Sequence, residues 1–340
     1  MDNLTNIDHA RDHTSENKFF YYLLPLVVLS LILNSISCFA IIRCNDLHKM
    51  LFVLIFNLAL GDVVTAIALS FHSGISLFVL KPNWTAFNVD TYCRISGVTI
   101  VGGITVGIYT LAAISIERFR IMVLRKKDNN LARKKWNLII MIFSLWTLSF
   151  GLSFPYLYLF RMYPREPCRC ELYSFNIQQF RYYLIIYSII VYLLPLIMII
   201  TAYIRIWMYI TRFTIANLII SNNSIALSVR NRRKHIFKML IVSTMTFMIF
   251  TAVVIYVPTM LAARDKITTE NKGTGLFMIR LGIILYLIST IINPLIYNYY
   301  CSAFRQAYFM YLPSWNCCTN PMSPKIMYYF HRLRKPAVCD

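Results

Sequence analysis

The sequence predicts an all-α membrane protein, a bundle of seven transmembrane helices followed by a short amphipathic eighth helix. First, 58% of the 340 residues are apolar and only 14% are charged, whereas soluble domains carry about 25% charged residues. Second, windows of about 20 mostly apolar residues, long enough to cross the hydrocarbon core, recur seven times along the chain. Third, these windows have helical length and lack the roughly ten-residue alternation of an outer-membrane barrel.

The basic residues predict the orientation of the chain. The net charge is +20, and most of the 34 lysines and arginines fall in segments that are cytosolic if the N-terminus lies outside. Because loops rich in Lys and Arg stay on the cytosolic side, we expect a multi-pass plasma-membrane protein with an extracellular N-terminus. A basic chain also raises the question of nucleic acid. Here the charge lies in short loops beside apolar runs, which favours membrane lipid as the partner and no nucleic acid.

The chain divides into four predicted parts. They are an extracellular arm, the seven-helix domain, the amphipathic helix and a cytoplasmic tail, at residues 1–19, 20–300, 301–312 and 313–340. Asn3 opens a glycosylation sequon in the arm. Cys317 and Cys318 follow the amphipathic helix and are candidates for S-palmitoylation, the alternative being two unmodified thiols.

The first two helices each carry polar residues in an apolar run. Asn34 lies at the centre of the first, roughly residues 20–43, where a lone Asn can simply bond a neighbouring helix. The second helix contains Asn57 and Asp62. A carboxylate at that depth must be neutral, paired or solvated in a cavity, so we predict a functional role for Asp62.

The third helix begins near Cys93 and ends in Glu117, Arg118 and Phe119. An acid and a base where a buried helix meets the cytosol are costly to place, which predicts a functional site. The alternative is that both charges only anchor the helix end at the lipid headgroups.

Prolines mark the last four helices. The fourth, which holds Trp146, ends near Pro155, and the other prolines stand at positions 195, 258 and 294. A proline inside a spanning helix leaves a carbonyl that neighbours or water must satisfy. Four such prolines predict a bundle that is built to bend.

Several function classes find no support in the sequence. No HExxH, GxSxG or P-loop motif appears, so we do not expect an enzyme. There is no CxxC pair and no His/Cys cluster with metal spacing, so we expect no metal site. A transporter that used Asp62 as its ion site would need further intramembrane charges and repeat-related broken helices, and neither is evident.

Taken in order and with their spacing, these residues resemble the rhodopsin-like (class A) family of G-protein-coupled receptors over roughly residues 20–311. Asn34 and the run Asn57-Leu58-Ala59-Leu60-Gly61-Asp62 match the family's first two helices. Cys93 stands 25 residues before Arg118, as the family's disulfide Cys does before its acid–Arg–aromatic triplet. The other matches are Trp146, Pro195, Tyr203, Pro258 and Asn293-Pro294-Leu295-Ile296-Tyr297, with Phe304 seven residues on.

The resemblance implies a receptor that passes an extracellular ligand signal to a heterotrimeric G protein, with arrestin as a further partner. In such receptors Arg118 is held by Glu117 at rest, and the sixth helix swings outward about Pro258 on activation. A receptor-fold scavenger that does not couple is the alternative. The residues assigned to the switch and to coupling are Glu117, Arg118, Phe119, Tyr203, Lys238, Tyr256, Pro258, Asn293, Pro294 and Tyr297.

The resemblance also implies a polar core and a disulfide bond. The core can hold water or a sodium ion, with no other cofactor expected. Cys93 would bond to a Cys of the second outer loop, where Cys168 and Cys170 both remain open. The predicted core residues are Asn34, Asp62, Ser289 and Asn293.

The chain departs from the family at its switch. The usual Cys-Trp-x-Pro reads Ile255-Tyr256-Val257-Pro258, and Gly107 stands where a small polar residue would supply a sodium ligand. Lys238 stands where some members place an acid that pairs with Arg118. We therefore expect a weak resting lock and raised basal signalling, which Lys238→Glu lowers.

The ligand class is only partly constrained. Ile100 stands where amine receptors of the family carry an Asp, which makes a biogenic amine unlikely as the ligand. Arg94 and Arg280 would lie near the outer end, with Tyr256 and Tyr286 deeper, which suits a peptide or an anionic small molecule. The alternative is that these arginines pair with acids of the outer loops or reach the headgroups.

Overall fold

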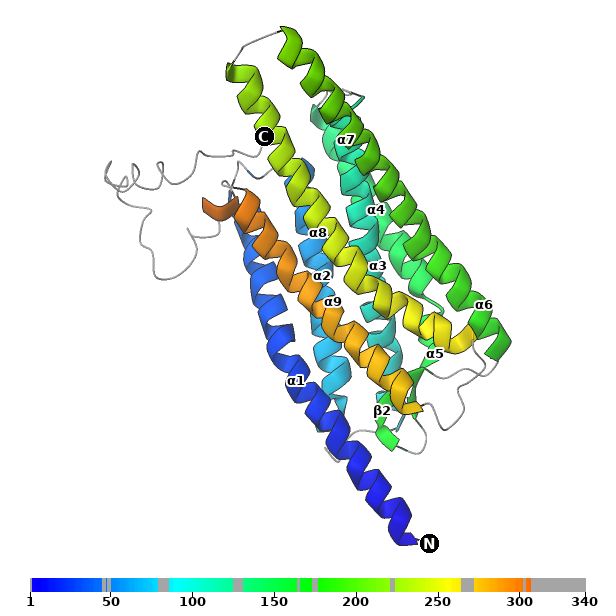
Figure 1. The fold of residues 1–340 in the computed structure, drawn as a ribbon. Helices are drawn as coiled ribbons and strands as arrows, with labels where there is room; N and C mark the ends of the chain where they lie inside the picture. The colour runs from blue at the N-terminus through cyan, green and yellow to red at the C-terminus, as the bar shows by residue number, and fades with distance from the viewer. Residues whose placement is uncertain are drawn as a thin grey trace, which may run out of the picture.

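The computed structural model confirms the bundle of seven membrane-length helices (Figure 1). It describes residues 2–44, 47, 50–78, 86–124, 131–163, 166–172, 177–220, 224–263, 272–301 and 304–306. Five spans lie in α1 (Asp2–Arg43), α2 (Met50–Phe78), α3 (Ala86–Met122), α8 (Ser224–Ala263) and α9 (Lys272–Tyr300), and a sixth begins in α4 (Leu131–Ser153) and ends at Leu159. The remaining span joins α6 (Ile177–Ser188), the π-helix η2 (Ile189–Leu193) and α7 (Leu194–Ile220).

The first helix is longer than the sequence pattern predicts. We placed its start near residue 20, but α1 begins at Asp2 and projects beyond the bundle at its N-terminal end (Figure 1). Residues 2–18 contain no Gly or Pro, so nothing in the sequence stops the helix there. The side chain of Asn3 lies outside the described residues, and so do Cys317, Cys318 and most of the predicted amphipathic helix.

A short β-hairpin interrupts the otherwise helical fold. The helix α4 ends at Ser153, Pro155 precedes the single turn α5 (Tyr156–Leu159), and strand β1 (Phe160–Tyr163) follows. Strand β2 (Glu166–Leu172) pairs with it antiparallel, with Met162 opposite Cys170. The fourth helix therefore stops at the proline as predicted, and the hairpin is the one β feature of the described residues.

The helix α3 lies at the centre of the bundle and α4 at its periphery. In the best membrane window of each helix, 78% of α3 is buried inside the protein but only 11% of α4. Glycines let the other helices approach α3 closely. A Cβ added at Gly103 would overlap the Thr65 hydroxyl of α2, and one at Gly107 would lie 2.8 Å from the Phe247 ring of α8.

Candidate functional site

Asn34 and Asp62, the mid-membrane polar residues of α1 and α2, both find partners on α9. The Asn34 amide donates to the carbonyl of Thr290 at 3.2 Å, and the Ser30 hydroxyl lies 2.8 Å from that of Thr290. Asp62 is 1% exposed, and its Oδ1 accepts a hydrogen bond from the Tyr286 hydroxyl at 3.3 Å. Buried polar groups in an apolar bundle need such partners, so these contacts hold three helices together.

Part of this core has unmet hydrogen-bonding capacity. The Oδ2 atom of Asp62 and the Nδ2 atom of Asn293 are buried and have no hydrogen-bond partner. The Ser289 hydroxyl is used by its own helix, since it donates to the carbonyl of Tyr286 at 2.6 Å. Of the four predicted core residues, Asp62 and Asn293 are the two with a fully buried side-chain atom that has no hydrogen-bond partner.

The residues around Asp62 do not fit a sodium ion. A hard cation collects several oxygen ligands, but Gly103 and Gly107 supply no side-chain oxygen on the α3 side. The Phe247 ring fills the space at Gly107 and packs edge-on against the Tyr286 ring, with 6.0 Å between centroids. Tyr286, predicted to line the ligand pocket, instead donates a hydrogen bond to one carboxylate oxygen of Asp62.

The third helix ends in the predicted triplet, at the opposite end from the Cys93–Cys170 disulfide. Glu117 is buried and forms an ion pair with Arg120, one turn on, at 3.6 Å. The Nε atom of Arg118 is buried without a hydrogen-bond partner. Phe119 packs against the core, and Lys238 is exposed on α8. The ion pair with Arg120 was missed at the sequence level, and a hold on Arg118 by Glu117 stays a prediction.

The predicted switch tyrosines both contact α8. The Tyr203 hydroxyl of α7 lies 2.8 Å from the Thr244 hydroxyl, and the Tyr297 hydroxyl of α9 lies 3.2 Å from that of Ser243. Ser243 also donates to Asn293 Oδ1 at 2.8 Å. Pro258 and Pro294 lie inside unbroken helices, α8 and α9. The two α8 hydroxyls were not singled out from the sequence, although adjacent Ser and Thr in an apolar run were a visible signal.

Asn57 joins three helices on the other side of the bundle. Its amide donates to Thr110 of α3 at 2.8 Å, and its carbonyl oxygen accepts from the indole nitrogen of Trp146 on α4 at 2.8 Å. Both ends of this buried amide are therefore satisfied. The contact fixes α4, which is otherwise exposed, against the centre of the bundle.

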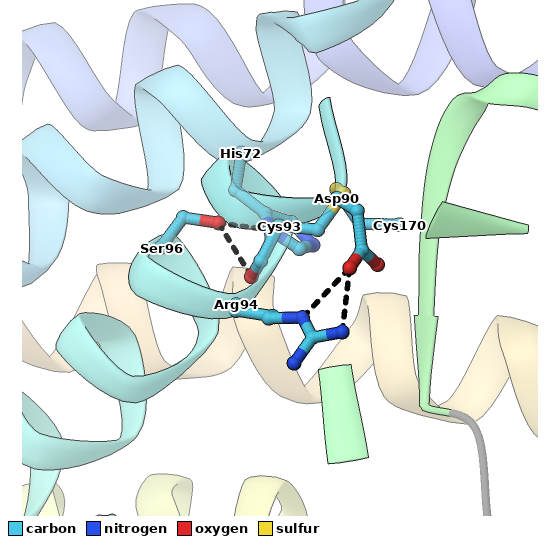
Figure 2. The surroundings of a disulfide bond; sticks show 6 residues. All are labelled: His72, Asp90, Cys93, Arg94, Ser96 and Cys170. Atoms are coloured by element: carbon cyan, nitrogen blue, oxygen red, sulfur yellow. Dashed lines mark hydrogen bonds and ion pairs between the residues drawn. A yellow bond between two sulfur atoms is a disulfide. The ribbon is translucent and has the colours of Figure 1, made fainter. Parts of the chain in front are cut away.

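The outer end of α3 is tied to the hairpin and to its own acid. Cys93 bonds to Cys170, which decides between the two candidate cysteines (Figure 2). Arg94 contacts Asp90, one turn earlier, through two nitrogen atoms. Its Nε lies 2.7 Å and its Nη2 lies 2.6 Å from Asp90 Oδ2 (Figure 2). We predicted Arg94 for a ligand and overlooked Asp90, although the i,i+4 spacing signals this pair.

The other predicted pocket residues have different surroundings. The guanidinium of Arg280 lies 4.9 Å from the centroid of the Phe19 ring. Tyr256 is half-buried and packs edge-on against Tyr192 of η2, with 5.2 Å between ring centroids. Ile100 is buried in the core. His72 was missed: its ring bonds Ser96 at 3.0 Å beside the disulfide, between α2 and α3 (Figure 2).

Comparison with known proteins finds one family and several receptors. The family described as "7 transmembrane receptor (rhodopsin family)" matches residues 33–297. Neuropeptide FF receptor 2 of Mus musculus is 24% identical over 305 residues, covering 84% of this chain and 70% of that receptor. The Rattus norvegicus receptor of the same name is 24% identical over 298 residues, covering 82% and 69%. Neuropeptide FF receptor 1 of Homo sapiens matches over 130 residues at 24% identity, covering 38% and 29%.

Proposed function

The chain belongs to the rhodopsin family of seven-transmembrane receptors, and from that premise we propose how it signals. A peptide ligand binds at the end that carries the Cys93–Cys170 disulfide. Binding changes the position of α8, and a heterotrimeric G protein docks at the opposite end. The N-terminus is then extracellular and the membrane is the plasma membrane, in agreement with the distribution of Lys and Arg.

The burial of Arg118 is the main observation that supports coupling to a G protein. Its Nε atom is buried at the cytosolic end of α3 and has no hydrogen-bond partner in the described chain. A buried donor atom of a cationic group is costly when it has no hydrogen-bond partner. It is therefore a ready binding point for the carbonyl or carboxylate groups of a docking helix. A receptor that only scavenged its ligand would gain nothing from this cost.

The relatives support a peptide as the ligand. Two of them are named as receptors of neuropeptide FF and match more than four fifths of this chain. Ile100 removes the Asp that an amine would need. The ordered hairpin over the outer end of α3 adds backbone groups that an extended peptide can bond. Arrestin binding, Asn3 glycosylation and Cys317 and Cys318 palmitoylation remain predictions.

Nucleotide exchange on reconstituted G proteins tests the proposal. The purified receptor is mixed in turn with each Gα class, with and without neuropeptide FF as the probe peptide. We expect at least one Gα class to exchange faster with the receptor, and Arg118→Ala to reduce the rate at least tenfold. The matched control is Arg212→Ala, which removes an exposed cation of α7. Equal rates with and without the receptor for every Gα class would leave the scavenger as the function.

A further inference from the structure

Two adjacent hydroxyl residues of α8 contact two different neighbouring helices. Ser243 and Thr244 are 1% and 0% exposed. The Ser243 hydroxyl donates to Asn293 Oδ1 of α9 at 2.8 Å and lies 3.2 Å from the Tyr297 hydroxyl. The Thr244 hydroxyl lies 2.8 Å from the Tyr203 hydroxyl of α7, which also donates to the Leu240 carbonyl at 3.4 Å.

The helix geometry explains why adjacent residues can do this. Consecutive side chains of an α-helix point about 100° apart, so neighbours i and i+1 face different partners. A single turn of α8 is thereby tied to the helices on both of its sides. Aromatic packing supports the α7 side, because Phe237 of α8 lies edge-on to Tyr203 and stacks on Trp207.

The chain has no acid at the position of α8 that would pair with Arg118. Lys238 is an exposed cation, so it cannot hold Arg118 as an acid at this position would. The cytosolic half of α8 is nevertheless closed against α7 and α9 by the contacts of Ser243 and Thr244. The polar contacts that join this part of α8 to α7 and α9 are therefore made by neutral hydroxyl groups.

We propose that Ser243 and Thr244 together form a latch that holds α8 closed in the resting receptor, in place of an ion pair to Arg118. The inference rests on the proposed coupling function and replaces our expectation of a weak resting lock. An interhelical hydrogen bond in a membrane protein shifts a two-state equilibrium by about threefold. Losing both sides of the latch therefore raises the open population by about tenfold. Ser243 and Thr244 are positioning residues, since they act by holding α8.

Three variants and one control test the latch. Ser243→Ala and Thr244→Val remove one hydroxyl each, and the double variant removes both. Thr244→Ser keeps the hydroxyl and loses only a methyl group. The control is Thr251→Val, because Thr251 lies on the same helix, is 0% exposed and has a hydroxyl with no hydrogen-bond partner. All variants are compared at equal surface expression.

Two readouts separate the latch from the proposed coupling. The first is basal nucleotide exchange on the G protein without peptide. The second needs no G protein: the distance between spin labels carried on unnatural amino acids at the exposed positions 120 and 234. The double variant should raise basal exchange about tenfold and populate a longer distance, while Thr244→Ser and Thr251→Val behave as the wild type.

The outcomes that contradict each idea differ. Unchanged distances in the double variant overturn the latch, whatever the exchange rates are. Longer distances with no exchange in any variant keep the latch and reject the coupling. If the double variant fails to reach the surface, Tyr203→Phe is measured instead, because it removes only the α7 contacts. An unchanged distance there would overturn the α7 half of the latch.

Discussion

The two ends of this receptor are held together by different kinds of bond. At the proposed outer end, a disulfide joins α3 to the hairpin, and Arg94 makes two contacts with Asp90. At the proposed cytosolic end, single hydrogen bonds between neutral side chains join α8 to α7 and α9. A covalent bond does not open at room temperature, whereas a hydrogen bond exchanges readily. The outer end is therefore built to keep its shape, and the cytosolic end to change it.

Removing the disulfide should have the largest effect and tests whether this bond stabilises the proposed outer end. Cys170→Ser should lower the free energy of unfolding by about 2–5 kcal/mol, because the bond closes a loop between residues 77 apart. Thermal unfolding of the purified receptor and surface labelling measure the loss. Cys168→Ser is the matched control and should leave both unchanged. Equal losses in the two variants would contradict the assignment of Cys170.

The contacts of Asn57, which join α2 to α3 and α4 and do not involve α8, can be tested in the same way. Asn57→Ala leaves the indole N–H of Trp146 unpaired, so unfolding should become easier by about 1–3 kcal/mol. Thr147→Ala, on the exposed face of α4, should change stability very little. Basal nucleotide exchange should stay the same in both variants, because α8 is untouched. A large rise of exchange in Asn57→Ala would show that the moving part extends beyond α8.

The ion pair of the outer end should contribute little stability. Arg94 and Asp90 are 26% and 27% exposed, and exposed pairs of this kind contribute about 0–1 kcal/mol. A double-mutant cycle with Arg94→Ala and Asp90→Ala, followed by thermal unfolding, measures their coupling. We expect a value below about 1 kcal/mol that falls with added salt. A larger, salt-independent coupling would mean that the pair, and not only the disulfide, fixes the outer end.

The smallest expected effect is that of sodium. Tyr286 donates to Asp62, and the Phe247 ring fills the space where a further ion ligand would stand. Sodium should therefore not stabilise the receptor. The unfolding midpoint is compared in sodium chloride and in N-methylglucamine chloride of equal ionic strength. Equal midpoints are expected. A clear rise in sodium that Asp62→Asn abolishes would show that the core does hold the ion.

The seven spans and the main polar positions could be predicted because their signals are local. The length of an apolar run, a proline, or an acid such as Asp62 inside the membrane can each be recognised within a single segment of the sequence. Asp90 and Arg94 were equally local, one helical turn apart, and were simply overlooked. Local signals also explain why the start of α1 was misplaced: composition marks where the membrane begins, not where a helix does.

The remaining contacts depend on how distant segments meet. Tyr286 reaches Asp62 across 224 residues, and Ser243 reaches Asn293 across 50. Such pairs follow from the rotation of each helix in the packed bundle, which no single segment encodes. The choice between Cys168 and Cys170 is similar, because it depends on how the hairpin lies against α3 in the folded chain.

A paired distance measurement tests the contrast between the two ends most directly. One receptor carries spin labels at the exposed outer positions 95 and 182, and a second carries them at the cytosolic positions 120 and 234. Both are measured alone and with a nucleotide-free G protein. We predict that the G protein lengthens the cytosolic distance and leaves the outer one within its original distribution. A fixed cytosolic distance, or an outer distance that changes more, would contradict the account.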